Sequence, residues 1–217
     1  MLRTLRVLLV RHGESEDNAG LPSESMGSTP LTPAGIRQAE AVAASLEAPP
    51  GLFAVSPYVR AQQTSAPARA RFPAVAVEEW PIQEFTFLPY SAYHGTTLAD
   101  RQSAEDAYWL KNDPRVVLGE GAESFVAFLA RVQEARERLE SLDCGSVVLF
   151  SHKKVVNALL WSWLAGRPSQ SARRMARFRS FDHAIKFPNG ACVDVRIEDG
   201  HAWLGPVRTD HLAAITG

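Results

Sequence analysis

Residues 5–12 have the sequence LRVLLVRH, in which an apolar run is followed at once by Arg11 and His12. Branched aliphatic side chains at consecutive positions are typical of a strand that is buried on both faces, as in a parallel sheet. Basic residues directly after such a strand lie at its carboxyl end, where open α/β sheets bind their ligands. This stretch therefore predicts both the class of fold and the place of a site.

The rest of the chain continues the alternation of strands and helices. We predict further strands at LFAVS (52–56), VAVEEW (75–80), SVVLF (146–150) and, nearer the sheet edge, ACVDVRI (191–197). Apolar spacing and capping residues predict helices from Thr32–Pro33 to Leu46, from Pro57 through Ala68, over 123–142 and over 155–164. This order predicts an α/β fold, a three-layer α/β/α sandwich with a mainly parallel central sheet.

Composition limits the classes of protein to which the chain can belong. Its 217 residues suit a single domain over 1–217, and 46% hydrophobic with 22% charged residues is globular composition. A net charge of -1 gives no reason to expect a nucleic-acid partner. Two cysteines favour neither a disulfide scaffold nor a zinc site. The first apolar run is too short for a signal peptide or membrane span, so we expect a cytoplasmic protein without a membrane partner.

Residues 81–121 depart from the regular pattern and are rich in aromatic side chains. We interpret them as an insertion over the carboxyl ends of the strands, with a short helix around 104–110. Long segments of this kind often determine specificity.

Several strand ends deliver reactive side chains to one rim of the predicted sheet. Arg60 follows the second strand, Glu84 lies shortly after the third, and His152 follows SVVLF. Together with Arg11 and His12 they form a set that suits phosphoryl transfer. Arginine presents a planar fork of donors to phosphate oxygens, a neutral histidine attacks phosphorus, and a carboxylic acid protonates the leaving group. Because arginine and histidine supply the positive charge, we expect neither a metal nor another cofactor.

The segments around these residues resemble the histidine phosphatase superfamily, the phosphoglycerate-mutase-like proteins. LLVRHGESEDN (8–18) is similar to the family signature, and the later segments follow in the family's order: LTPAGIRQAE (31–40), SPYVRAQQTS (56–65), GAESFVAFLARV (121–132) and VVLFSH (147–152). An Arg-His-Gly match by itself would be weak evidence, whereas the ordered set covers most of the core.

The resemblance implies a role for each matching residue. His12 is implied as the nucleophile that accepts the phosphoryl group, and Arg11, Arg60 and His152 as the phosphate pocket, with Asn18 as a further phosphate contact. Glu84 is implied as the proton donor. Glu120 and Glu123 are alternatives for the role of the acid, and His94 and Asp100 lie in the insertion, from which they could reach the site.

Two departures from the family pattern bear on function. Lys153 and Lys154 follow His152 where the family usually has glycine, and either add charge beside the pocket or start a solvated helix. The Trp-Glu-Gly tail of true phosphoglycerate mutases is missing after Glu84. We therefore predict a phosphatase that acts on a small phosphomonoester.

Other functions remain open at this stage. The alternatives are a phosphomutase, a phosphoprotein phosphatase and a phosphate-binding module without turnover. The basic stretch from Arg167 through Arg173, Arg174, Arg177 and Arg179 is interpreted as a solvated helix face rather than an anion site. The sequence also leaves a homodimer open.

Overall fold

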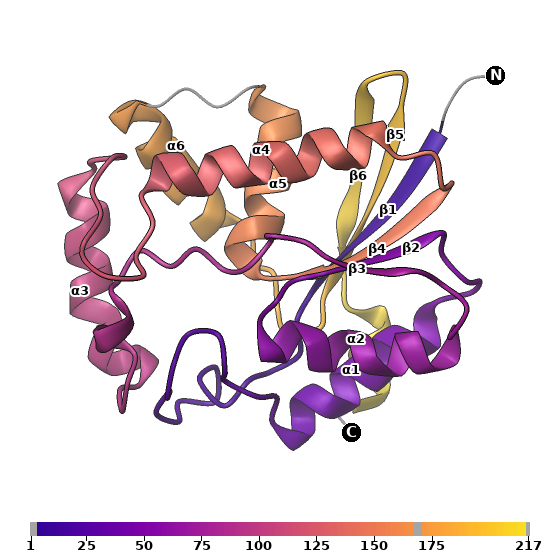
Figure 1. Cartoon of the computed structure of the whole chain (residues 1–217), viewed down its shortest axis with the longest axis horizontal. Coiled ribbons are helices and arrows are strands. Elements are labelled where there is room, and N and C mark those ends of the chain that lie inside the picture. The colour runs from indigo at the N-terminus through magenta and orange to yellow at the C-terminus, as the bar shows by residue number, and fades with distance from the viewer. Residues whose placement is uncertain (1–3, 167–170, 216–217) are drawn as a thin grey trace.

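The computed structural model describes residues 4–166 and 171–215, and it is a three-layer α/β/α sandwich (Figure 1). The strands are β1 (Thr4–Arg11), β2 (Leu52–Val55), β3 (Val77–Glu79), β4 (Ser146–Ser151), β5 (Cys192–Glu198) and β6 (His201–Arg208). The helices are α1 (Pro33–Ser45), α2 (Val59–Arg71), α3 (Leu98–Lys111), α4 (Phe125–Ser141), α5 (Lys153–Ala165) and α6 (Ala172–Ala184), with short 3-10 turns η1 (Tyr90–Ala92) and η2 (Asp210–Ile215).

The strands form one sheet in the order β3-β2-β4-β1-β5-β6. Strands β1 to β4 are parallel, whereas β5 pairs antiparallel with β1 and β6 pairs antiparallel with β5. The register between the central strands sets Arg11 opposite Ser151. As a result the residues that follow β1 and β4, His12 and His152, emerge side by side at the carboxyl edge.

Strand β1 is buried on both faces because its side chains serve two separate cores. Leu5, Val7 and Leu9 belong to the larger core, which includes side chains of α4 and α5. Val10 points to the opposite face and packs in the smaller core with residues of α1 and α2. Two apolar faces account for the unbroken apolar run from which the parallel sheet was predicted.

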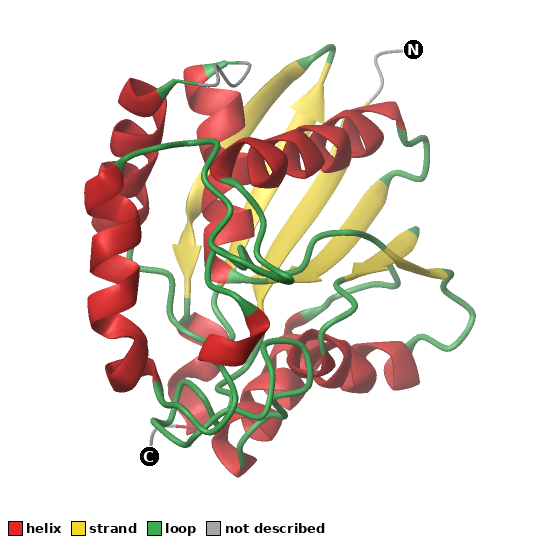
Figure 2. Ribbon diagram, turned by 60° about the vertical axis from the view of Figure 1, so that its left-hand side comes forward, coloured by secondary structure: helices red, strands yellow, loops and turns green. Residues whose placement is uncertain are grey.

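The segment predicted as an insertion lies beyond the carboxyl ends of the strands, at the left of Figure 1 and in front of the sheet in Figure 2. Its main element is helix α3, which is longer than the short helix expected around 104–110. Thr97 and Asp100 form a capping box at its start, in which each side chain accepts from the other residue's backbone N–H.

The structure corrects three other sequence predictions. Helix α2 begins at Val59 rather than Pro57 and contains Pro67 in its interior. Strand β6 (His201–Arg208) was not predicted. It forms the edge of the sheet next to β5, which had itself been expected nearer the edge. The basic stretch, predicted as a solvated helix face, lies on α6, where Arg173 and Arg177 are exposed. Arg174 and Arg179 are half-buried instead, because Arg174 donates to the backbone oxygen of Gly166 and Arg179 pairs with Asp106 at 3.4 Å; Arg167 lies outside the described residues.

Among the described residues, no helix is both long enough and apolar enough to cross a lipid bilayer.

Candidate active site

The loop after β1 approaches helix α1 so closely that only glycine fits at position 13. A Cβ atom on Gly13 would lie 2.4 Å from the backbone oxygen of Gly35, near the start of α1. The backbone N–H of Gly13 donates to Thr64 Oγ1 of α2 at 3.0 Å. The Arg-His-Gly segment is therefore held by the backbone of α1 on one side and by the Thr64 side chain of α2 on the other, which fixes the position of His12.

His12 is buried and its two ring nitrogens face different partners. Nδ1 lies 2.7 Å from the backbone oxygen of Gly13, so it carries the proton and donates there. Nε2 is therefore unprotonated, and its lone pair accepts from Arg60 Nε at 3.2 Å. Burial, followed by the charges of Arg60 and Arg11, holds the pKa of His12 well below its ordinary 6.5. The ring is neutral at physiological pH, as a nucleophile requires.

Arg11 and Arg60 bring two buried guanidinium groups to the same place. Arg11 Nη1 donates to the backbone oxygen of Phe187, while its Nε is buried without a partner among the described residues. Arg60 Nη1 donates to the backbone oxygen of Met26 at 2.6 Å. Burial lowers the pKa of Arg11 to about 10 and also lowers that of Arg60, yet both remain cations at neutral pH. Their charge suits a phosphate group.

His152 stands beside His12, with 5.1 Å between the ring centroids. Its Nε2 is 2.8 Å from Ser56 Oγ, and its Nδ1 is buried with no partner within the described part of the chain. Burial and then the charge of Arg60 hold the pKa of His152 well below 6.5. The ring of His152 is therefore neutral in the free protein. If Ser56 donates to Nε2, the proton of that ring lies on Nδ1.

Asn18 lines the cavity in front of His12, and its amide is oriented by a residue that sequence reasoning missed. Asn189 Nδ2 lies 3.2 Å from the backbone oxygens of both His12 and Gly13, which only an NH₂ group can satisfy. The same Nδ2 is 2.8 Å from Asn18 Oδ1. Because Oδ1 is taken up by Asn189, the NH₂ group of Asn18 is the part left to donate to a ligand.

Glu84 also lines this cavity, which has a volume of about 150 Å³ and includes Arg11, His12 and Arg60 in its wall. The carboxylate accepts from the backbone N–H of Phe85 at 2.9 Å and from that of Lys154 at 3.4 Å. The structure therefore brings together all six residues singled out from the sequence: five of them line the cavity, and His152 is in ring contact with His12.

The competing acidic and histidine residues lie elsewhere. Glu123 forms an ion pair with Arg131 at 2.6 Å, and Glu120 is exposed. Asp100 caps α3, and His94 is exposed beside Glu24. None of these four residues lines the cavity in front of His12.

Lys153 and Lys154 begin helix α5, and both side chains line the cavity. Lys153 Nζ is 3.3 Å from Asp182 Oδ2, and Lys154 Nζ is 3.3 Å from Glu105 Oε1 of α3. Burial tends to lower the pKa of Lys154, but Glu105, Glu84 and Asp182 raise it above its ordinary value. Of the two sequence interpretations, added charge beside the pocket therefore describes these lysines better.

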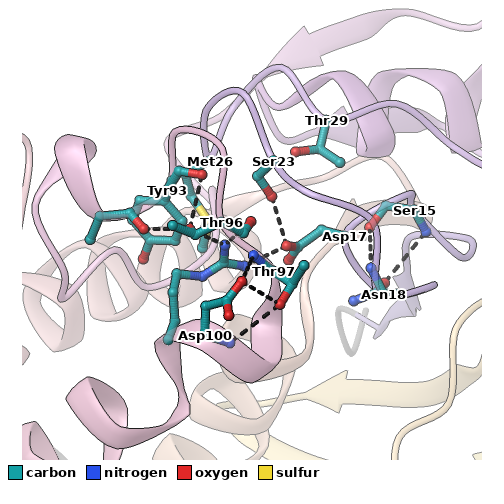
Figure 3. Close-up of polar contacts among 12 residues, drawn as sticks. Ser15, Asp17, Asn18, Ser23, Met26, Thr29, Tyr93, Thr96, Thr97 and Asp100 are labelled. Atoms are coloured by element: carbon teal, nitrogen blue, oxygen red, sulfur yellow. Dashed lines mark hydrogen bonds and ion pairs between the residues drawn. The ribbon is translucent and has the colours of Figure 1, made fainter.

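Besides the pair between Glu105 and Lys154, which joins α3 to α5, a second ion pair joins α3 to the loop that carries Asn18. Arg101 pairs with Asp17, donates to the backbone oxygen of Thr96 and lies over the ring of Tyr93. Figure 3 shows Ser23 beside Asp17. The hydroxyl of Ser23 donates to the Asp17 carboxylate at 2.7 Å. We refer to the Arg101–Asp17 pair with its neighbours Ser23 and Thr96 as the latch. It attaches the insertion to the rim of the cavity.

The sequence of residues 7–199 matches the family model of the histidine phosphatase superfamily (branch 1). The chain belongs to the histidine phosphatase superfamily. The family predicted from the ordered motifs is confirmed, and with it the phosphohydrolase class that its named relatives share.

Individual members of the superfamily resemble this chain over most of its length. The adenosylcobalamin/alpha-ribazole phosphatase of Salmonella typhimurium (strain LT2) is 33% identical over 162 residues, which cover 72% of this chain and 78% of that protein. The crystal structure of the alpha-ribazole phosphatase from Shigella flexneri has a TM-score of 0.71 at 27% identity and covers 94% of this chain and 96% of that chain. Phosphoserine phosphatase from Entamoeba histolytica shares the fold, with a TM-score of 0.71 at 21% identity over 96% of this chain and 99% of that chain.

Proposed function

We propose that this protein hydrolyses a small phosphomonoester through a phosphohistidine on His12. The observation that carries the proposal is the environment of His12 Nε2. Nε2 is unprotonated because Nδ1 carries the proton and donates to Gly13, and its lone pair accepts from Arg60 Nε at the wall of a cavity that both Arg11 and Arg60 line. A neutral nucleophile among fixed positive charges is the arrangement that a phosphoryl dianion needs.

In the first step the phosphoryl group binds to Arg11, Arg60 and the amide of Asn18. His152 lies beside His12, and its Nδ1, which has no partner among the described residues, is the further donor when Ser56 donates to Nε2. Nε2 of His12 attacks phosphorus in line, and the bond between phosphorus and the ester oxygen breaks. Glu84, in its protonated form, gives its proton to that oxygen, and the alcohol leaves. The buried arginines stabilise the charge that spreads over the three equatorial oxygens.

In the second step the same carboxylate, now ionised, takes a proton from a water molecule that attacks phosphohistidine. The bond between Nε2 and phosphorus breaks, inorganic phosphate leaves, and Glu84 regains its proton. Each of the two transfers uses the same set of charges, so one rigid site serves both.

The test is hydrolysis of an aryl phosphate in excess chelator by the wild type and by His12→Ala. We expect chelator-resistant activity that is lost in the variant, together with a phosphorylated protein trapped by acid quench in the wild type only. Activity that disappears with chelator would refute the arginine and histidine mechanism. Because relatives are named alpha-ribazole phosphatases, alpha-ribazole 5′-phosphate is the first natural phosphomonoester to assay. The cytoplasmic location and a homodimer stay predictions.

A further inference from the structure

The cavity in front of His12 has two parts that differ in charge. The inner part is formed by His12, Arg11, Arg60, Asn18 and Glu84. We refer to the other residues that line the cavity, from the loop after β1, from 85–105 and from the first turn of α5, as the outer part; its three cations are Arg101, Lys153 and Lys154.

Each cation of the outer part already has a carboxylate partner. Arg101 pairs with Asp17, and both side chains are largely buried. Lys154 pairs with Glu105, which also lines the cavity, at 3.3 Å.

The charge of Lys153 is compensated by Asp182, a residue that does not line the cavity. Its Nζ donates to the backbone oxygen of Asp182 at 2.9 Å and lies 3.3 Å from the carboxylate of the same residue. Asp182 is buried and is further held by Asn157 Nδ2 at 2.6 Å. The outer part therefore presents no unpaired cation among the residues that the structure describes.

The two arginines of the inner part differ from these three cations. Within the described residues neither Arg11 nor Arg60 has a carboxylate within ion-pair distance. Both donate to backbone oxygens, and Arg60 also donates to His12. The buried Nε of Arg11 has no partner there at all. Glu84 is the acidic residue that acts most strongly on both arginines, but it forms no ion pair with either, so their guanidinium groups remain available to the phosphoryl group.

Between the ion pairs, the wall of the outer part is apolar and aromatic. Phe87, Leu88 and Tyr93 are buried and contribute to the lining. Lys154 Nζ lies 5.7 Å from the centre of the Phe87 ring, so its aliphatic stem and the ring share one surface. Together with Leu98, which is exposed and lines the same cavity, these three buried side chains provide an apolar surface that carries no ion pair.

From this charge pattern we infer that the substrate is the phosphate ester of an uncharged alcohol with an apolar or aromatic body, and that a second anionic group on the alcohol is rejected. The inference rests on the proposed phosphatase function and adds the class of alcohol. A second anion in the outer part would meet Asp17 or Glu105, or would have to break an ion pair to reach a cation, and both are unfavourable in a partly buried wall.

The same pattern bears on the phosphomutase alternative. A mutase must hold an intermediate with two phosphoryl groups, and the second group would lie in the outer part. There, carboxylates already occupy Arg101, Lys153 and Lys154. The outer part therefore favours release of the dephosphorylated alcohol.

Two aryl phosphates test the inference, 4-carbamoylphenyl phosphate and 4-carboxyphenyl phosphate. They have nearly the same shape and differ in one charge on the leaving group. For the wild type we expect kcat/KM to be at least about tenfold higher for the carbamoyl compound, which corresponds to one broken ion pair. The difference should lie mainly in KM, because the charge acts on binding and not on the phosphoryl group.

The variant Glu105→Gln removes the partner of Lys154 with little change in shape. We expect it to raise the relative kcat/KM for the carboxylated compound by about tenfold, since a cation is now free. The control is Asp106→Asn on the next residue of α3. Asp106 pairs with Arg179 and does not line the cavity, so this variant should keep the wild-type ratio.

The outcomes separate the two proposals. Equal kcat/KM for both compounds in the wild type, or an unchanged ratio in Glu105→Gln, would overturn the inference about the alcohol and leave the phosphatase proposal standing. If the wild type hydrolyses neither compound, the proposed function fails. Calorimetric binding of the two compounds to His12→Ala then decides the charge preference, and equal affinities would refute it.

Discussion

The inner end of the cavity and its outer wall are held in place by different means. Arg11, His12 and His152 lie at the ends of β1 and β4, whose backbone ladder sets their spacing. The outer wall depends on side-chain pairs between segments far apart in the chain, such as Arg101 with Asp17. The backbone hydrogen bonds between two strands persist when a side chain is replaced, whereas an ion pair is lost when either of its side chains is replaced. We therefore expect changes in the inner part to affect the chemical step and changes in the outer wall to affect substrate choice.

The largest effect should come from removing a charge of the inner part. Arg60→Met keeps much of the side-chain volume and loses the guanidinium beside His12 Nε2. We expect kcat to fall by about two to three orders of magnitude, because the transition-state charge loses a fixed partner. The control is Arg69→Met, on the same helix but bonded to Gln62 rather than to the site. Steady-state kinetics with an aryl phosphate would measure both, and a change confined to KM would contradict the role of Arg60.

The inner part should also appear in the pH dependence of stability. Burial and the nearby arginines lower the pKa of His12 and His152 below 6.5 in the folded state. As the pH falls below 6.5, the unfolded chain binds protons that the folded protein does not. The free energy of unfolding should therefore decrease by up to about 1.4 kcal/mol per pH unit for each histidine. Urea unfolding at several pH values would measure this slope. It should be smaller in His152→Asn and unchanged in His201→Asn, which replaces an exposed histidine of β6.

A smaller effect is expected from Asn189, which acts through Asn18. Without its amide, Asn18 is free to turn its oxygen toward the phosphate. Asn189→Ala should lower kcat/KM by about tenfold, the cost of one misoriented donor to a charged group. If Asn189 acts only by orienting Asn18, the double variant with Asn18→Ala should be no worse than Asn18→Ala. Additive losses in this cycle would show that Asn189 has an independent role.

The smallest change should follow from opening the latch. Arg101→Met removes the pair with Asp17 and the bonds to Thr96. We expect KM to rise a few-fold with kcat nearly unchanged, and amide hydrogens of α3 to exchange faster, because the insertion loses an attachment to the rim. Lys111→Met, an exposed change at the end of α3, should alter neither quantity. A large loss of kcat in Arg101→Met would mean that the latch also shapes the inner part.

The sequence predicted those parts of the molecule whose signal is local. β1 and β4 were predicted because both of their faces are apolar, and the site residues because they follow strand ends. The strand His201–Arg208 was missed because Gly205 and Pro206 interrupt it; proline is tolerated there since β6 is an edge strand. The start of α3 carried a readable signal in Thr97 and Asp100 that the irregular composition around it obscured.

Other features of the site have no local signal in the sequence. The partners Asp17 and Arg101 are 84 positions apart, and Asn18 and Asn189 are 171 apart. Charge and amide groups of this kind occur on many surfaces, and only the folded chain shows which of them meet. The pairing of Lys154 with Glu105 is a further example. The sequence alone indicates a basic pocket beside His152, whereas this ion pair compensates the charge of Lys154 in the outer part.

The sheet order has a consequence for how the protein reaches this state. Strand β4 lies between β2 and β1, so these two early strands do not pair with each other. Until residues 146–151 have left the ribosome, the place between them is empty and each has an open edge. We expect the nascent chain to expose apolar strand edges for most of its synthesis, and folding to be governed by the late insertion of β4.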